Sequence, residues 1–568
     1  MDYSPQPQRP SSKRPRGDPH HPSTTFEFGR HHVHVGATTK SPSFDAKEIS
    51  LEIHRSVTTK QRLTTLTYLL NLIQSRRVQR NASEAEQHQA ILRSLVHSGS
   101  VNALCLQLGY VLHRKESTRQ EIEMICTALN SFYTQCPDLA TDESVETIAS
   151  ELIQLLLSAY SRGVIGPVIS IWHVLTGSAS GTALLLQHPD VLTQISETMQ
   201  NHRSELLLEC LGLLKNLSYY SQECRQQISE HSTMLETLSG IPSSETNTKV
   251  LERLSAVFRN LALSPNTRLY LAQQPTVLTA LVQLSSHNSQ TILRNVLNTF
   301  VSIAMDGDSC IRLVFHGEGL LIKVLTRLLN YNGDSMIRKR ASRVVRLLCR
   351  DGSATFLISD AVLIETTAHL AIHDTNSDVR KEAADAFAAC TEFFDPTMDR
   401  YGTMLDTLES FVASQRVSLD CIARALINQM EKPQNQQEVL KRRTLVDSFG
   451  TIASSEQSSN VSKQDICKII MDLSSKDSTI HLVTSETIIS ALVFNLSNNT
   501  TVSNQNNEQR QDFAVKALLN LSGIEGNRKV MANHPNLLQA MIQYASKASN
   551  DHCKEEVKAM IIQLTTQL

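Results

Sequence analysis

Aromatic side chains are scarce in this chain of 568 residues: they make up 5% of it, and Trp172 is the single tryptophan. A chain this long exceeds what one globular core usually holds. Helices packed through Leu, Ile, Val and Ala need few aromatics, so the scarcity favours a modular, helical architecture. No run of 18 apolar residues occurs, and no apolar segment follows Met1, so we expect neither membrane insertion nor a signal peptide. The net charge of −2 excludes polyanion binding by bulk charge.

Paired cysteines and known catalytic motifs are also missing. The 11 cysteines are scattered, mostly within expected helices, and no Cys-x-x-Cys occurs. This pattern predicts buried, reduced thiols in the cytoplasm or nucleus rather than disulfides or a zinc site. No Walker loop, dinucleotide fingerprint, HExxH or GxSxG is present. We therefore predict a protein that is not an enzyme and that holds no cofactor or metal ion.

What the sequence does contain is a recurring helical stretch. Leu207–Ser218 reads LLECLGLLKNLS, with leucines at i, i+4, i+7 and i+10 on one helix face. The endings of Leu254–Ala262 (LSAVFRNLA) and Ala514–Ser522 (AVKALLNLS) repeat it. With the Asn of this box as a phase mark, successive marks lie 43, 43, 44, 42, 45 and 42 residues apart. The marks are Asn130, His173, Asn216, Asn260, Ser302, Leu347 and Ala389.

A period near 43 with helical contents is typical of armadillo and HEAT repeats. The chain resembles the armadillo family from about Asp45 to its end. The most specific feature is the box at Asn216, Asn260 and Asn520, and Asn527-Arg528 matches the Asn-Arg that the family carries after it. One repeat, DTNSDVRKEAADAFAAC, has the Asp-Val-Arg of HEAT repeats. The resemblance implies an all-α, right-handed α-solenoid and an adaptor of the catenin class.

The chain divides into a tail and a solenoid. Residues 1–44 are rich in Pro, Ser, His and Arg without helical periodicity, which predicts a disordered basic tail. Its cluster Lys13, Arg14, Pro15 and Arg16 resembles a nuclear localisation signal, with a merely solvated charge cluster as an equal alternative. Residues 45–568 are the expected solenoid, regular over 90–394 and irregular over 395–568. In the irregular part the phase marks slip, and Thr451, Asn495 and Asn520 follow at 62, 44 and 25 residues.

The resemblance also implies a binding groove. In armadillo proteins the third helix of each repeat lines a concave groove, where the Asn of the box can bond the main chain of an extended peptide. This role would fall to Asn216, Asn260 and Asn520, and less directly to Asn71, Asn130 and Asn495. We also expect Asn298, in the basic stretch, to hold the partner's main chain together with Asn260. Alternatively, these amides satisfy only local backbone groups. The importin-α branch needs Trp four residues before the mark, and none is present here.

Charge is distributed unevenly along the solenoid. Residues 249–350 carry 14 Lys or Arg against 5 Asp or Glu, whereas residues 351–410 carry 3 against 12. Arg343 and Arg346 lie four residues and one residue before the mark Leu347, and Lys215 and Arg259 directly precede two other marks. Arginine suits bidentate contacts to carboxylates or phosphates.

From these observations we predict a scaffold, in cytoplasm and nucleus, that binds a protein partner through an extended acidic or phosphorylated segment. The expected oligomeric state is a monomer. A transport receptor of the importin class is a second reading, disfavoured by the missing Trp. Nucleic-acid binding is a third, disfavoured because aromatics are not interleaved with the basic stretch.

Overall fold

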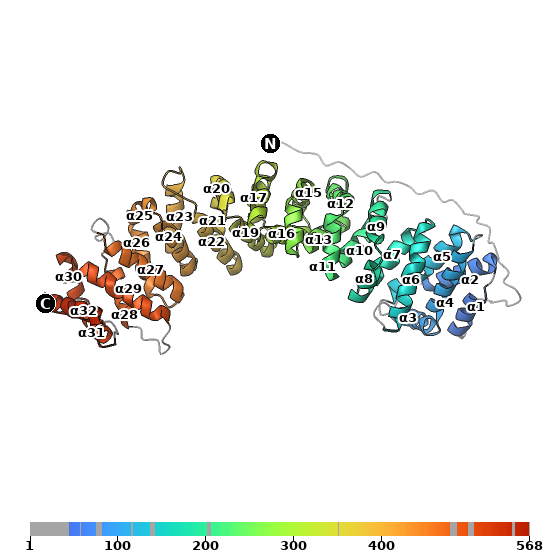
Figure 1. Cartoon of the computed structure of the whole chain (residues 1–568), viewed down its shortest axis with the longest axis horizontal. Coiled ribbons are helices and arrows are strands. Elements are labelled where there is room, and N and C mark those ends of the chain that lie inside the picture. The colour runs from blue at the N-terminus through green and yellow to red at the C-terminus, as the bar shows by residue number, and fades with distance from the viewer. Residues whose placement is uncertain are drawn as a thin grey trace, which may run out of the picture.

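The fold is described from a computed structural model. It covers residues 45–56, 58–74, 82–114, 117–136, 143–201, 206–349, 351–476, 485–497, 505–547 and 551–566. The regular elements in these residues are all helices. They stack side by side in one elongated, gently curved row, with α1 at one end and α32 at the other (Figure 1). The chain is thus an all-α solenoid, as the period predicted.

One row of helices, the third-helix row, runs through the whole stack, each member packed on the next. Its members are α2 (Thr59–Gln74), α5 (Arg119–Gln135), α7 (Gly166–Leu175), α10 (Leu207–Tyr220), α13 (Thr248–Leu261), α16 (Gln290–Ile303), α19 (Ser335–Leu348), α22 (Ser377–Thr391), α24 (Leu419–Met430), α27 (Asn460–Ser474), α29 (Gln505–Ser522) and α32 (Asp551–Thr565). All seven regular phase marks, from Asn130 to Ala389, lie on this row or at its helix ends.

A second row covers one side of the first. It consists of α1 (Ala46–Arg55), α4 (Ser100–His113), α6 (Glu143–Ser161), α9 (Val191–Asn201), α12 (Ser232–Ser244), α15 (Pro275–Ser285), α18 (Leu320–Leu329), α21 (Ala361–His373), α23 (Tyr401–Ser414), α26 (Arg443–Ser454), α28 (Glu486–Ser497) and α31 (Leu537–Lys547). First helices precede many of these: α3 (Ala82–His97), α8 (Ala179–Leu186), α11 (Gln222–Glu230), α14 (Pro265–Ala272), α17 (Gly307–Phe315), α20 (Asp351–Ser359), α25 (Pro433–Leu440) and α30 (Glu525–Ala532). The 3₁₀ turn η3 (His316–Gly319) joins α17 to α18.

The leucine spacing of the repeated stretch is what builds the core. Leu211, Leu214 and Leu217 of α10 are all fully buried, and α10 packs against both α7 and α13. Each third helix between α2 and α32 therefore buries its apolar face between two neighbours, and the core is continuous from repeat to repeat.

Side chains of the following first helix bond the ends of the third helices. Arg268 of α14 donates to the carbonyls of Ala262 and Leu263, at 2.9 and 3.0 Å. Asn527 and Arg528 of α30 donate to those of Leu521 and Ser522, at 3.1 and 3.3 Å. The last carbonyls of a helix have no partner within it. Because these carbonyls need donors from outside the helix, the side chains of the Asn-Arg pair that follows the box have a structural role.

The slip of the phase marks after Ala389 has a structural cause. Residues 392–400 form turns instead of a first helix, and the mark of the next third helix, α24, lies nearer the start of its helix. This mark is Asn428, 39 residues after Ala389. Thr451 and Asn495 lie on α26 and α28, which belong to the second row, so the assignment of these two residues to the third-helix series was wrong.

The sequence also predicts helix starts at Pro189, Pro275 and Pro535, and the structure confirms one of the three. Pro275 is the first residue of α15, where a fixed φ suits a helix start. Pro189 and Pro535 instead lie in turns two residues before α9 and α31.

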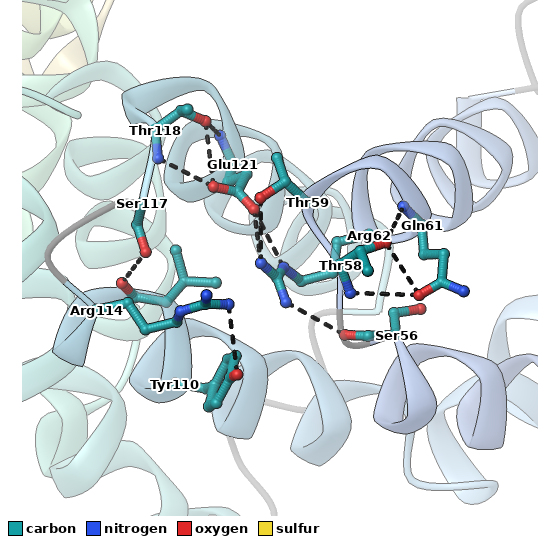
Figure 2. Close-up of polar contacts among 11 residues, drawn as sticks. Ser56, Thr58, Thr59, Gln61, Arg62, Tyr110, Arg114, Ser117, Thr118 and Glu121 are labelled. Atoms are coloured by element: carbon teal, nitrogen blue, oxygen red, sulfur yellow. Dashed lines mark hydrogen bonds and ion pairs between the residues drawn. The ribbon is translucent and has the colours of Figure 1, made fainter.

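A buried ion pair connects the first two third helices (Figure 2). The Arg62 guanidinium on α2 donates to Glu121 Oε1 on α5 at 2.9 and 3.1 Å, and the two side chains are 2% and 0% exposed. Glu121 Oε2 accepts from the Thr118 amide at 2.9 Å, within the capping box that starts α5. Burial alone would raise the pKa of Glu121, but the Thr118 amide and the Arg62 guanidinium outweigh it and lower that pKa.

The buried leucines give a first prediction. Leu214→Ala should reduce the free energy of unfolding by about 2–5 kcal/mol, because the side chain is fully buried between repeats. Leu106→Ala is the matched control, since Leu106 is 59% exposed. Equilibrium denaturation of the two variants measures the difference. Equal stabilities would mean that the helix face was assigned incorrectly.

The buried ion pair gives a second prediction. Arg62→Met should cost about 3–5 kcal/mol at pH 7, because it leaves Glu121 buried without its partner. Since the folded pKa of Glu121 is below its unfolded value, the pair stabilises the fold above the unfolded pKa. That contribution is lost as the pH falls through the folded pKa, so the cost of the substitution should shrink in acid.

Hydrogen exchange of α2 and α5 at pH 7 and pH 4 reports this change. Arg93→Met, at an exposed arginine of α3, is the control. A cost that does not depend on pH would show that Arg62 acts through packing alone.

Candidate third-helix surface

The asparagines of the box bond the preceding repeat. Asn216 donates from Nδ2 to the His173 carbonyl on α7 at 3.2 Å. Asn260 is fully buried, and its Nδ2 donates to the Lys215 carbonyl at 3.0 Å and to Ser218 Oγ at 3.2 Å, both on α10. Its Oδ1 accepts from Arg259 Nη2 at 3.1 Å. The assignment of Asn260 to a partner's main chain is therefore corrected: its amide joins two repeats.

The same bond recurs further along. Asn520 donates to Ser474 Oγ on α27 at 3.2 Å. Asn428, which the sequence reading missed, donates to the Ala388 carbonyl at 3.0 Å and to Thr391 Oγ1 at 3.2 Å. Asn495 is buried on the second row and bonds the Ala453 carbonyl at 2.9 Å, so it does not face a groove lined by third helices. Asn298 differs, because it is partly exposed and no described residue hydrogen-bonds its amide.

The predicted cations separate into two kinds. Lys215 on α10 and Arg343 on α19 are exposed, and neither has an ion pair among the residues that the structure describes. Arg346, one turn after Arg343, is instead paired: its Nε lies 3.0 Å from Glu382 Oε1 on α22, and the two side chains are 32% and 16% exposed. Arg346 is thus a link between repeats, and its assignment as a free partner contact is corrected.

The basic and acidic segments meet between α19 and α22. Arg338 pairs with Asp374 at 2.6 Å, and Lys339 pairs with Asp378 at 2.7 Å. Burial would raise the pKa of Asp374, but the Arg338 guanidinium and the Asn376 amide outweigh it and lower that pKa. On the next helix, α24, Arg424 pairs with Asp385 of α22 at 3.0 Å. Three cations of the basic segment, Arg338, Lys339 and Arg346, are therefore neutralised by the acidic segment, which the linear count of residues could not show.

Gly212 occupies the position where an importin-α repeat would place tryptophan. A Cβ there would lie 2.5 Å from the His173 ring and 2.6 Å from Arg253 Nη1, so these two side chains cover the α10 backbone. His173 Nδ1 lies 2.5 Å from Glu209 Oε2, and the His173 hydrogen bond, against the opposing effect of burial, lowers the pKa of Glu209. Trp172 itself is buried on α7 and stacks against Tyr160. The described third helices thus lack the tryptophan slots of that branch.

Exposed apolar side chains lie three residues after successive marks, a feature that the sequence reading missed. Tyr219, Leu263 and Met305 are 58%, 49% and 46% exposed at the ends of α10, α13 and α16. The sequence does contain a signal for these side chains, because each lies three residues after its mark, Asn216, Asn260 or Ser302. Together with Lys215, Arg259, Asn298 and Arg343, they define what we call the third-helix surface.

The sequence also led to predictions about the cysteines, membrane-spanning helices, metal ligands and the basic cluster of the tail. Ten of the cysteines are buried in the described structure, and burial raises the pKa of thiols such as Cys105 and Cys224 to about 12. Among the described residues no single helix is long and apolar enough to cross a membrane, although two bent helix pairs pass that test by length and composition. No group of metal-ligating side chains occurs in the same ranges. Lys13, Arg14, Pro15 and Arg16 lie outside the described residues.

Comparisons with known proteins support the fold. No family model matches the sequence, and no curated protein matches it. The crystal structure of an engineered protein is similar with a TM-score of 0.52 and 16% identity, covering 84% of this chain and 99% of that one. A structure concerning a conserved phosphorylation switch in the interaction of cadherin with β-catenin is similar with a TM-score of 0.52 and 11% identity. It covers 88% of this chain and 100% of that one. The chain is thus an armadillo-like helical repeat protein by fold.

The contrast between Arg343 and Arg346 can be tested directly. Arg346→Gln should cost about 1–3 kcal/mol, because Glu382 is mostly buried and loses its charged partner. Arg343→Gln should change stability by no more than about 0.5 kcal/mol, because an exposed side chain without a partner is replaced. Denaturation of both single variants measures this difference between two arginines on one helix. The reverse order of the two costs would contradict the ion-pair assignment.

Proposed function

We propose that this chain is a non-enzymatic scaffold of the catenin type that binds an extended acidic or phosphorylated segment of a partner protein along its third-helix surface. The supporting observation is that Lys215 and Arg343 are exposed there without any carboxylate partner among the described residues. Arg259 lies between them in the stack, and among the described residues its guanidinium bonds only the neutral amides of Asn260 and Asn295. These cations attract a ligand of opposite charge.

An extended segment suits the spacing of this surface. Adjacent packed helices lie roughly 8–10 Å apart, so about two or three residues of an extended chain span one repeat. The exposed Tyr219, Leu263 and Met305 add one apolar contact per repeat beside the cations. A segment that alternates acidic and apolar residues therefore fits the surface better than a uniformly charged one. A basic nuclear signal, the ligand of the importin-like alternative, has the wrong charge for it.

Charge reversal tests this function. The variant Lys215→Glu with Arg343→Glu should weaken binding of an acidic 15-residue peptide by roughly a hundredfold or more, because each charge-assisted contact contributes about 1.5–3 kcal/mol. The matched control is Arg312→Glu with Lys323→Glu. It changes the net charge equally at exposed residues of α17 and α18, outside the third-helix row.

Fluorescence anisotropy with an acidic peptide, a basic peptide and a single-stranded RNA, each over a range of salt concentrations, separates the alternatives. Preferred binding of the basic peptide supports the importin-like reading, and preferred binding of RNA supports nucleic-acid association. If the charge-reversed variant and its control bind the acidic peptide equally well, the third-helix surface is not the binding site.

A further inference from the structure

Arg340 on α19 lacks the polar partner that residues at the same position of neighbouring third helices have. Seven residues before each mark, successive third helices carry Glu209, Arg253, Asn295, Arg340 and Glu382. Arg253 Nη1 bonds the Leu208 carbonyl at 2.5 Å and lies 4.0 Å from Glu209. Asn295 accepts from Arg259 at 3.2 Å, and Glu382 pairs with Arg346. Arg340 alone makes no hydrogen bond or ion pair within the described ranges, although it is partly buried.

Two further guanidinium groups bond residues on α16 and at the start of α19, the helix that carries Arg340. Arg259 extends from α13 onto α16, where it bonds Asn295. Arg294 extends from α16 to the start of α19, where its Nε lies 2.6 Å from Asp334 Oδ2. Burial lowers the pKa of Arg340, and the positive charges of Arg294 and Arg259 lower it further, because each of them repels the Arg340 guanidinium. Asp334 acts in the opposite direction on Arg340 and is the carboxylate that faces this cluster.

We propose that Arg340, with Arg259 and Arg294, forms a subsite for the phosphate group of a phosphorylated side chain in the bound segment. The three guanidiniums and the Asp334 carboxylate leave two positive charges. A phosphate monoester carries a charge of about −1.5 to −2 at pH 7 and offers three acceptor oxygens, whereas an Asp or Glu side chain carries a single negative charge. Guanidinium forks match phosphate geometry in a bidentate manner. The subsite rests on the proposed function, because it selects among the acidic segments that the surface would bind.

The experiment uses the full chain and three degenerate 13-residue peptide libraries, whose fixed central residue is phosphoserine, aspartate or serine. The wild-type chain should retain the phosphoserine library at least about tenfold better than the aspartate library, since a charge-assisted contact contributes roughly a factor of ten or more. Arg340→Gln should abolish this preference and still bind the aspartate library. Arg340→Lys should keep part of it, because the charge remains and the fork is lost. Arg312→Gln, at an exposed arginine of α17, is the control and should bind like the wild type.

Thermal melting of Arg340→Gln provides a second readout. Because the substitution removes a partly buried charge beside two like charges, the melting temperature should stay the same or rise. A lower melting temperature would assign Arg340 a structural role and overturn the proposal.

The remaining outcomes distinguish the subsite from the proposed function. Equal retention of the phosphoserine and aspartate libraries overturns the subsite and leaves acidic-segment binding intact. A phosphoserine preference that survives Arg340→Gln also overturns it. Retention of neither acidic library contradicts the proposed function itself. Competition by inorganic phosphate at matched ionic strength, as strong as that of the phosphoserine library, would assign the site to a small free anion instead of a protein segment.

Discussion

The apolar contact between neighbouring third helices is the constraint on which this solenoid depends. Leu211, Leu214 and Leu217 have no exposed surface, and they are hidden by helices of adjacent repeats. A single repeat could not bury this face alone, because its own helices cover only part of it. The apolar face of each third helix is therefore fixed by stacking, and side chains that bind a partner must lie on its other faces.

Polar groups that the stacking buries must be satisfied from the next repeat. The buried amide of Asn260 bonds the carbonyl of Lys215, and the amide of Asn428 bonds that of Ala388 in the same way. Leaving such a group without a partner in the interior costs about 1–3 kcal/mol. The Asn of the box thus persists for a structural reason in this chain, and binding specificity must reside in the exposed side chains around it.

The sequence predicted the parts of the structure that follow from periodicity. The apolar face of α10 and the placement of the marks from Asn130 to Ala389 needed only the helical repeat and its period. The predicted positions of the marks were wrong after Ala389, where the spacing between marks changes. Residues 392–400 form turns in place of a first helix there, and the next mark is Asn428. No local pattern in a single sequence distinguishes the second helix that carries Asn495 from a third helix, since both are amphipathic and both bury an asparagine.

Ion pairs between neighbouring repeats also could not be predicted from the sequence. Arg343 and Arg346 look equivalent in a linear reading, but only Arg346 has an acid one repeat away, at Glu382. The nearest acidic neighbour depends on how far α22 is rotated and displaced against α19, and a residue count contains neither quantity. For the same reason the charge excess of residues 249–350 overstated the number of free cations.

The pattern of pairing along the stack decides where a ligand of negative charge can bind. The acids of α22 neutralise Lys339 and Arg346 on α19 and Arg424 on α24, and they leave Arg343 without an ion pair in the described part of the chain. An acidic segment placed there would have to displace an existing carboxylate and would gain little. Between α10 and α19, Arg294 pairs with Asp334 and Arg253 lies near Glu209. Lys215, Arg259 and Arg343 have no ion pair among the described residues, so a ligand adds attraction at these three without displacing a carboxylate. The acids of α22 therefore confine the attractive part of the surface to the repeats that precede them.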